Sequence, residues 1–344
     1  MYFLISVSSE SFHRMMTMRV FYRQLGIDAS ATRDAPELLR RVRHSFGGRL
    51  ILLDWGAGEV LADTAVTGVS GLATLEQTVV AGSWIDQCVY MLDQHGDVTA
   101  LTHPWFNYIH SVDITPGGTL LLASAGSDLI IELTPSGGVV WHWFGPEHGY
   151  DACPDGSAAF FDRHADYRRM RRSTAEQAMH VTSAVLESKR NVLATLYHQG
   201  SLVAIDRETG RAETLLGGLR RPHGLHRCDG GFILSDTLGH RALLLDRELA
   251  VRSEVSYGSQ WLQDTILTSA GTYLTLENVH IDQLPKPGLT NRLTEIDGDG
   301  KRLRGVDVGS QARLFTAREL DESFARSLAR RWHRSDQLRG WHWN

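Results

Sequence analysis

The chain has few cysteines and no long apolar run, and both absences narrow the class of protein. Its cysteines are Cys88, Cys153 and Cys228, which lie far apart and form no Cys-x-x-Cys motif. This spacing argues against a disulfide framework and against a thiolate zinc site. No apolar stretch approaches the roughly 20 residues that a membrane-spanning helix needs. Because no export signal precedes the first apolar segment either, we expect a cytoplasmic protein with no membrane partner.

Charge is not concentrated in any part of the chain. The formal net charge is -5 over 344 residues, and 22% of the residues are charged. These values indicate neither disorder nor a general nucleic-acid binder. No basic stripe with interleaved aromatic residues occurs, so we expect no nucleic-acid partner. We expect a small-molecule substrate instead, and the sequence leaves the oligomeric state open.

An internal repeat organises the chain: a short apolar run ending in Leu or Ile, then Asp, then a turn. The copies are Leu53-Asp54, Leu92-Asp93, Ile205-Asp206, Leu245-Asp246 and Ile296-Asp297, with a weaker copy at Leu133-Thr134. Neighbouring copies lie about 40 residues apart, which is the length of a four-stranded propeller blade. Short runs of branched and aromatic residues between Gly and Asp turns support strands. We therefore predict an all-β fold, a six-bladed β-propeller that forms one domain over residues 1–344.

The two ends of the chain and two insertions depart from the repeat. The first repeat lacks an inner strand, and residues 312–316 could supply it. That pairing would close the ring and remove exposed strand edges. We predict short helical decorations in the remaining segments: a helical insertion at 8–48 and a helical tail at 318–344. Residues 145–179 are predicted to form a lid between the third and fourth blades.

Histidine recurs at the start of three successive inner strands. These residues are His110, His180 and His223 in the third, fourth and fifth repeats. The starts of the inner strands meet at one mouth of a propeller's channel, so their side chains should converge there. Three neutral imidazoles can bind a divalent metal and leave one position open for water or substrate. We predict a three-histidine metal centre, with zinc as the expected ion.

The loops that leave the second strands end at the same mouth and supply further candidates. His198 and His240 are candidates for a fourth ligand or for acid–base roles. Tyr197, Asp236 and Glu277 are candidates for proton transfer or substrate orientation. The predicted substrate contacts are Trp84, Thr182, His280, Arg168 and Arg172. The two arginines belong to the predicted lid, which would place a cationic cover over a polar or negatively charged substrate.

One stretch resembles a known group of proteins. Gly137-Gly138-Val139-Val140-Trp141-His142-Trp143, His180-Val181-Thr182-Ser183 and Pro222-His223-Gly224 are similar in order and spacing to arylsulfotransferase-like propellers, over about residues 105–250. The resemblance implies that His223 is a nucleophile forming a covalent sulfo-intermediate, with His110 and His180 holding sulfate oxygens. Thr182 replaces the family's asparagine, and Tyr197 or His198 replaces its arginine, which removes a bidentate anion clamp.

Three functions are consistent with these residues. The leading hypothesis is an enzyme with metal-assisted lyase, hydrolase or group-transfer chemistry on a small polar or aromatic molecule. The second is a metal-independent, arylsulfotransferase-like transfer through the His223 imidazole. The third is a propeller that binds a ligand or protein without catalysis. A measurement of metal content, a covalent adduct on His223 and the effect of histidine substitutions on turnover separate the three.

Overall fold

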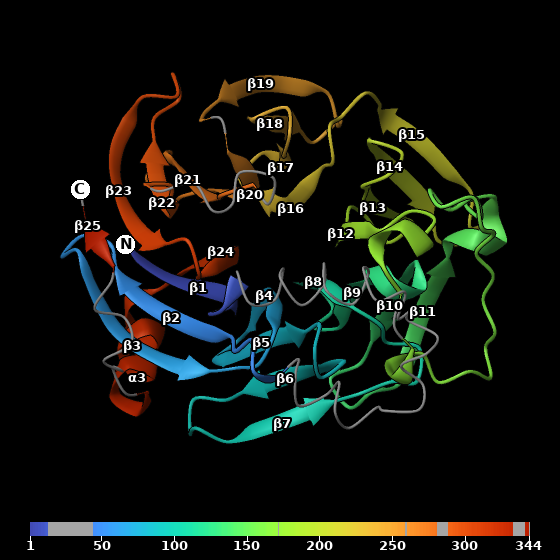
Figure 1. The fold of residues 1–344 in the computed structure, drawn as a ribbon, viewed down its shortest axis with the longest axis horizontal. Helices are drawn as coiled ribbons and strands as arrows, with labels where there is room; N and C mark the ends of the chain where they lie inside the picture. The colour runs from blue at the N-terminus through green and yellow to red at the C-terminus, as the bar shows by residue number, and fades with distance from the viewer. Residues whose placement is uncertain (13–43, 171, 259, 281–287, 333–340, 344) are drawn as a thin grey trace.

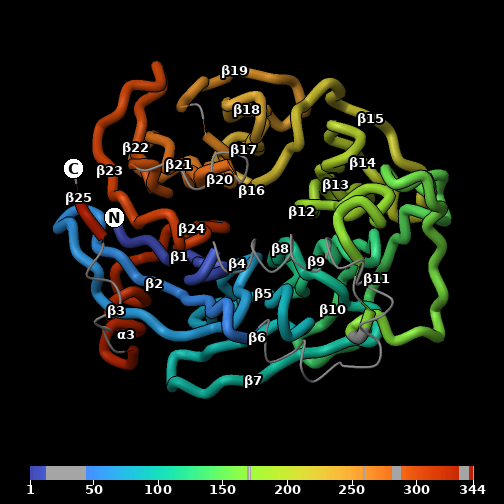
Figure 2. The backbone as a smooth tube through the Cα atoms, viewed as in Figure 1, coloured from blue at the N-terminus to red at the C-terminus, as the bar shows by residue number. Residues whose placement is uncertain are grey.

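The computed structural model describes residues 1–12, 44–170, 172–258, 260–280, 288–332 and 341–343. Within these ranges the strands form six antiparallel sheets arranged around a central channel (Figure 1). The tube view in Figure 2 follows the chain from sheet to sheet around the ring. The predicted six-bladed β-propeller is confirmed. No helix in the described ranges is long and apolar enough to span a bilayer.

Each blade consists of strands that follow one another from the channel outward. Blade 1 contains β24 (Arg313–Leu320), β1 (Tyr2–Ser9), β2 (Arg49–Asp54) and β3 (Glu59–Ala65). Blade 2 contains β4 (Val69–Leu75), β5 (Thr78–Ser83), β6 (Cys88–Leu92) and β7 (Val98–Leu101). Blade 3 contains β8 (Ile109–Ile114), β9 (Leu120–Ser124), β10 (Leu129–Leu133) and β11 (Val139–Phe144).

The second half of the ring repeats this order. Blade 4 contains β12 (Val181–Leu186), β13 (Asn191–Leu196), β14 (Ser201–Asp206) and β15 (Ala212–Leu216). Blade 5 contains β16 (His223–Cys228), β17 (Gly231–Asp236), β18 (Arg241–Asp246) and β19 (Val251–Ser256). Blade 6 contains β20 (Trp261–Leu267), β21 (Tyr273–Asn278), β22 (Asn291–Ile296) and β23 (Arg302–Gly309), and β25 (His342–Trp343) adds a fifth strand at its edge.

The core consists of apolar layers between neighbouring blades. In β9, Leu120 and Leu122 pack against blade 2, whereas Leu121 and Ala123 pack against blade 4. Successive side chains of a strand point to opposite faces, so a strand between two blades must be apolar on both. This is why the middle strands are nearly continuous apolar runs. The wedges of buried side chains fix the blades and thereby the starts of the inner strands.

The ring closes by pairing the two ends of the chain, as predicted. Strand β24 lies antiparallel to β1, with Leu4 opposite Arg318. The predicted helical tail differs from the structure at its start, because residues 318–320 still belong to β24. A helix does follow, α3 (Glu322–Arg331), which begins at an Asp321 cap and buries Phe324 against blades 1 and 2. At the other end of the tail, β25 is a strand.

The structure describes only part of each of the two predicted insertions. The predicted helical insertion at 8–48 starts too early, because β1 runs through Ser9. The rest of it falls largely on residues 13–43, outside the described residues. The described part of the segment 145–179, which omits residue 171, contains three 3₁₀ turns: η3 (Gly145–His148), η4 (Tyr167–Arg169) and η5 (Thr174–Glu176). Another 3₁₀ turn, η2 (Ala125–Ser127), links β9 to β10. The role of the segment as a lid stays a prediction.

Candidate functional site

The structure brings the three predicted histidines together. The His110 ring lies 5.3 Å from the His180 ring and 5.3 Å from the His223 ring, measured between centroids. His110 belongs to β8, His223 begins β16, and His180 directly precedes β12. All three side chains are buried. We call this group, together with Tyr197 and Trp261, the mouth cluster.

Asp128 positions the backbone of His180. Its carboxylate accepts hydrogen bonds from the backbone N–H groups of Ala178, Met179 and His180, at 2.7, 3.0 and 2.9 Å. His180 has a φ of 48°, in the left-handed region that a residue other than glycine rarely adopts. Three bonds to one buried carboxylate over-determine this conformation. The imidazole Nδ1 of His180 in turn contacts Oε1 of Gln177.

The tautomer of His223 follows from its neighbours. Its Nδ1 lies 2.9 Å from the backbone oxygen of Arg221 and 2.9 Å from Oγ1 of Thr237. Because a carbonyl oxygen can only accept, Nδ1 carries the hydrogen and Nε2 keeps its lone pair when the ring is neutral. His110 is bonded in a similar way, to the backbone oxygen of Thr182.

Burial keeps two of these imidazoles neutral. It lowers the pKa of His110 to about 4, partly offset by hydrogen bonds to backbone oxygens. It also lowers the pKa of His223 well below its usual value, with His110 and Arg313 contributing in the same direction. Both rings are therefore unprotonated at neutral pH and offer nitrogen lone pairs. In kind, these donors suit zinc.

The donors are not arranged around a common ion. Within the described ranges, no group of three or more His, Cys, Asp or Glu side chains has a metal-binding arrangement. The residues thus fit zinc by chemistry and not by position, and we derive no step through a metal. The predicted zinc centre stays a prediction.

Aromatic rings form a wall beside the histidines. The ring of Tyr197 lies 4.9 Å from His180 and 5.6 Å from His223, and the ring of Trp261 lies 5.5 Å from His223. Trp84 packs 5.5 Å from Tyr108, whose ring is 6.0 Å from His110. Such surfaces accept flat apolar groups.

Two arginines stand over this wall. The guanidinium of Arg221 lies 5.2 Å from the Tyr197 ring centroid, and that of Arg313 lies 5.5 Å from the Trp261 centroid. Burial raises the pKa of the Tyr197 hydroxyl, while Arg221, which is also hydrogen-bonded to it, acts in the opposite direction. The phenol is therefore protonated at neutral pH.

Sequence reasoning missed Tyr108, Arg221, Arg313 and Trp261 as members of the site. A signal exists for the first two, since each precedes an inner-strand histidine by two residues. Both have left-handed backbones, with φ values of 54° and 57°. Arg313 comes from β24 and its position depends on ring closure. His280 lies 5.5 Å from Trp261, at the edge of the same wall.

Several predicted residues are engaged elsewhere. Nε2 of His198 lies 2.8 Å from the backbone oxygen of Thr174, although its ring is 6.1 Å from His180. Nδ1 of His240 lies 2.8 Å from the backbone oxygen of Gln260. Asp236 accepts from the Arg220 backbone N–H at 2.6 Å and pairs with Arg241 at 2.9 Å. These contacts support the loops around the mouth, and catalytic roles for the three stay predictions.

Thr182, Arg168, Arg172 and Glu277 also have partners or surroundings that the structure defines. Thr182 donates to the backbone oxygen of Pro222 at 2.8 Å and so ties blade 4 to blade 5. Arg168 pairs with Asp166 at 2.8 Å, and Arg172 lies 5.7 Å from the Tyr167 ring, both within the 145–179 segment. Glu277 is buried, and burial raises its pKa to about 7 despite Arg292 and Arg302 nearby.

Comparison with known proteins supports the fold. No family model and no curated protein matches the chain, so the arylsulfotransferase-like resemblance gains no support. A solved streptogramin B lyase matches with a TM-score of 0.52 and 11% identity, over 78% of this chain and 86% of that one. A virginiamycin B lyase from Staphylococcus aureus matches with a TM-score of 0.52 and 8% identity, over 79% and 88%.

A solved structure that is not named as a lyase matches with a slightly higher TM-score. A chain of a nidogen–laminin complex has a TM-score of 0.56 and 12% identity, over 92% of this chain and 97% of that one. At such identities the likeness extends to the arrangement of blades and not to the chemistry of the site. The chain is thus similar in fold to these proteins, two of which are named as lyases.

Proposed function

We propose that the chain is an enzyme that carries out lyase-type elimination on a small aromatic or polar molecule at the mouth cluster. The observation that carries the proposal is the pairing of a neutral, oriented imidazole with a protonated phenol. His223 and Tyr197 have rings 5.6 Å apart. An elimination needs a base for the proton that leaves and an acid for the departing group.

His223 would act as the base through Nε2. The bond from Nδ1–H to the Arg221 backbone oxygen fixes the orientation of the ring and leaves Nε2 open. By itself, the depressed pKa makes this imidazole a weak base. A negatively charged substrate group beside the ring would raise that pKa toward neutrality, so the base becomes effective when the substrate is bound.

Tyr197 would act as the acid. Its hydroxyl is protonated, and the guanidinium of Arg221 would stabilise the phenolate after transfer of the proton. Arg221 and Arg313 would hold an anionic group of the substrate, while Trp261 would stack on a flat apolar part. These roles predict a substrate that combines an aromatic or apolar part with a polar or anionic group.

Quinupristin, the compound in the structure of a related-fold lyase, serves as the first test substrate. One structure neighbour is a catalytically inactive virginiamycin B lyase with quinupristin. We would incubate the protein with quinupristin and a panel of small aromatic acids, and follow products by mass spectrometry. We expect a product from the wild type and a loss of about 10²–10⁴-fold in rate for His223→Gln and Tyr197→Phe.

The matched control is the exposed His95, which lies in the turn after β6. His95→Gln should retain the wild-type rate. Equal rates in His223→Gln and the wild type would contradict the assigned base. Binding without turnover across the panel, unchanged by these substitutions, would favour the non-catalytic ligand-binding propeller.

A second candidate, sulfuryl transfer, is favoured by one observation. The guanidinium of Arg221 stands beside Tyr197, near the place where the sequence lacks the expected arginine. Nε2 of His223 would attack the sulfur of an aryl sulfate, the sulfur–oxygen bond would break, and the departing phenolate would take the proton of Tyr197. Incubation with 4-nitrophenyl sulfate should then leave one sulfo group on His223. An unmodified His223 and no nitrophenol would rule this candidate out.

The zinc centre is proposed separately. The side chains of His110, His180 and His223 would have to reorient to hold the ion, because their present arrangement surrounds no common position, and the ion would supply Lewis-acid polarisation of a substrate oxygen. Metal analysis after dialysis against zinc should give one ion per chain in the wild type and none in His110→Asn/His180→Asn. An equal zinc content in both proteins would contradict the three-histidine site.

A further inference from the structure

A second group of charged side chains lies deeper in the channel. Asp113, His226, Asp264 and Arg318 come from the inner strands β8, β16, β20 and β24. They line one cavity, which is also bordered by His110, Thr182 and Phe315. Because β8 runs away from the mouth, Asp113 lies farther along the channel than His110. We call these four residues the channel site.

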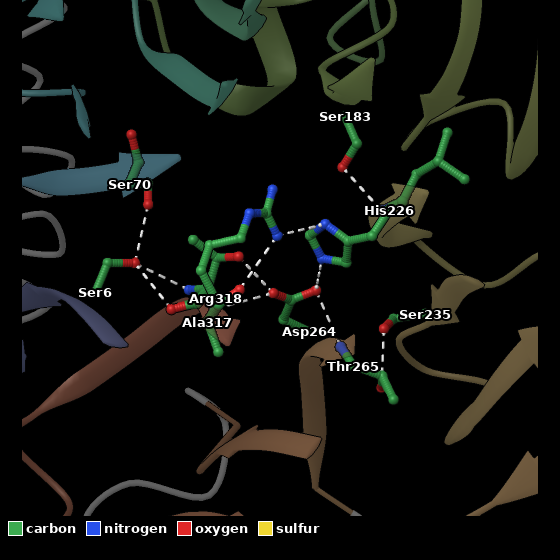
Figure 3. Close-up of polar contacts among 11 residues, drawn as sticks. Ser6, Ser70, Ser183, His226, Ser235, Asp264, Thr265, Ala317 and Arg318 are labelled. Atoms are coloured by element: carbon green, nitrogen blue, oxygen red, sulfur yellow. Dashed lines mark hydrogen bonds and ion pairs between the residues drawn. The ribbon is translucent and has the colours of Figure 1, made fainter. Parts of the chain in front are cut away.

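Asp264 is the anchor of the channel site (Figure 3). Its carboxylate accepts from Nε2–H of His226 at 2.5 Å, from the Thr316 hydroxyl at 2.5 Å and from the Thr265 backbone N–H at 2.9 Å. The Ala317 backbone N–H adds a bond at 3.3 Å. Burial raises the pKa of the Asp264 carboxyl group, but these hydrogen bonds and the positive charge of Arg318 hold it below its usual value. Asp264 is thus ionised and its acceptor capacity is used by the protein.

His226 connects Asp264 to Arg318 by a hydrogen bond at each of its ring nitrogens. Since Nε2 donates to Asp264, the other nitrogen, Nδ1, accepts from Nη1 of Arg318 at 2.7 Å. An imidazole that donates at one nitrogen and accepts at the other is neutral. Nη1 also donates to the Ala317 backbone oxygen at 3.1 Å. The guanidinium is therefore held at one end, by contacts that reach from β24 across to β16.

The other edge of Arg318 is unused by the protein. Within the described ranges, Nε and Nη2 of Arg318 donate to no protein acceptor, and the side chain borders the cavity. Arg318 is partly exposed, so solvent reaches this part of the channel. A guanidinium edge with two parallel N–H donors matches the two oxygens of a carboxylate.

Asp113 faces the same cavity from β8. No donor of a described side chain bonds its carboxyl group, and Asp113 and Arg318 form no ion pair with each other. Burial raises the pKa of Asp113, and the charges of Arg318 and Arg227 and a bond from the Ile114 backbone N–H offset part of that shift. In its protonated form, this carboxyl group offers one O–H donor to the cavity.

We propose that the channel site binds a small monocarboxylate, with its two oxygens on the free edge of Arg318 and a hydrogen bond from the Asp113 carboxyl group. The proposal does not depend on the enzyme proposed above, because none of the four residues takes part in the elimination. A monoanion fits the charges better than sulfate or phosphate, since Asp264 stays ionised nearby and would repel a second negative charge. The carboxylate can come from a free acid or from one end of a larger substrate.

The experiment is a titration of the full chain with sodium formate at constant ionic strength, read from the NMR line width of the formate proton. We expect saturable broadening by the wild type and binding at least about tenfold weaker in Arg318→Gln, because a charge-assisted bidentate contact is lost. Acetate should compete, and chloride and sulfate should compete weakly. A longer carboxylate that competes as well would identify a substrate end as the source.

Asp113→Asn keeps the test decisive if Arg318→Gln does not fold. Asparagine donates at every pH, so this variant should bind formate with an affinity that does not change between pH 5 and 8. The wild-type affinity should fall by up to about tenfold per pH unit above the pKa of Asp113. Arg190→Gln, which changes an exposed arginine paired with Asp206, is the control and should bind as the wild type does.

Two results would overturn the proposal. One is the absence of saturable formate binding in the wild type, which would leave the channel with solvent only. The other is equal binding by the wild type and a folded Arg318→Gln variant. Turnover at the mouth cluster enters neither result, so failure here is distinguishable from failure of the proposed elimination.

Discussion

Glu277 should make the stability of the protein depend on pH in a direction unusual for a carboxylate. The side chain is 2% exposed at the end of β21, and its Oε1 occupies the space that a Cβ at Gly258 would take. Burial raises its pKa from 4.5 to about 7, and Arg292 and Arg302 offset only part of that shift. The folded state therefore holds the proton to a higher pH than the unfolded state.

The sign and size follow from this difference. Below pH 4.5 the carboxyl group is protonated in both states and costs no free energy of unfolding. As the pH rises from 4.5 through 7, the unfolded state ionises first, and the free energy of unfolding falls. A shift of that size corresponds to about 3 kcal/mol once both states are ionised. Glu277→Gln replaces the acid by a neutral amide of the same shape. Its free energy of unfolding should exceed that of the wild type by about 1 kcal/mol at pH 5 and about 3 kcal/mol at pH 8.

Urea denaturation at several pH values between 5 and 8 measures this difference. Titration of other groups affects both proteins equally, so only the gap between the two curves is compared. Glu213→Gln, which changes an exposed glutamate of β15, is the control and should run parallel to the wild type. A gap for Glu277→Gln that stays constant with pH would refute the reasoning, because the carboxyl group would then titrate alike in both states.

Three further predictions concern the groups that support the two sites. Gly224→Ala should destabilise the protein by about 3 kcal/mol, since Gly224 has a φ of 53° and a Cβ there would overlap Oδ1 of Asp264. Gly271→Ala, with a φ of 76° and open space, should cost only about 1 kcal/mol in the same urea assay. Asp128→Ala should lower the free energy of unfolding by more than about 2 kcal/mol, because three backbone N–H groups near His180 lose their acceptor. Asp128→Asn keeps an acceptor oxygen and should lower it by less, which thermal melts of the two variants would show. Folding lowers the pKa of His110 from 6.5 to about 4, so the unfolded state binds a proton more readily as the pH falls. The free energy of unfolding of the wild type should therefore drop by about 2 kcal/mol from pH 7 to pH 5 because of this group. Urea titrations of His110→Gln should lack that drop.

The sequence allowed the blades and the three histidines to be predicted for the same physical reason. Strands buried on both faces leave a recurring apolar run, and the blade length then places His110, His180 and His223 at equivalent positions. The arginines of the mouth could not be placed in this way. Arg221 reaches Tyr197 through a left-handed turn, and Arg313 enters from a strand that belongs to the other end of the chain.

The channel site escaped prediction because it depends on depth along the inner strands. Irregular pairing between His223 and His226 and between Leu262 and Asp264 alters which side chains face the channel. A pattern was nevertheless present: His110 and Asp113, His223 and His226, and Trp261 and Asp264 are each three residues apart. A second polar residue at this spacing in several blades indicates a second layer of side chains in the channel.

The pairing of β24 with β1 also sets an order for assembly. During synthesis, five blades and the outer strands of blade 1 can form before β24 leaves the ribosome. Until then the first blade lacks its innermost strand, the channel has an open side, and Asp264 lacks the Thr316 and Ala317 donors. Arg318 and Arg313 arrive on that strand together, so one late event completes both the mouth and the depth of the channel.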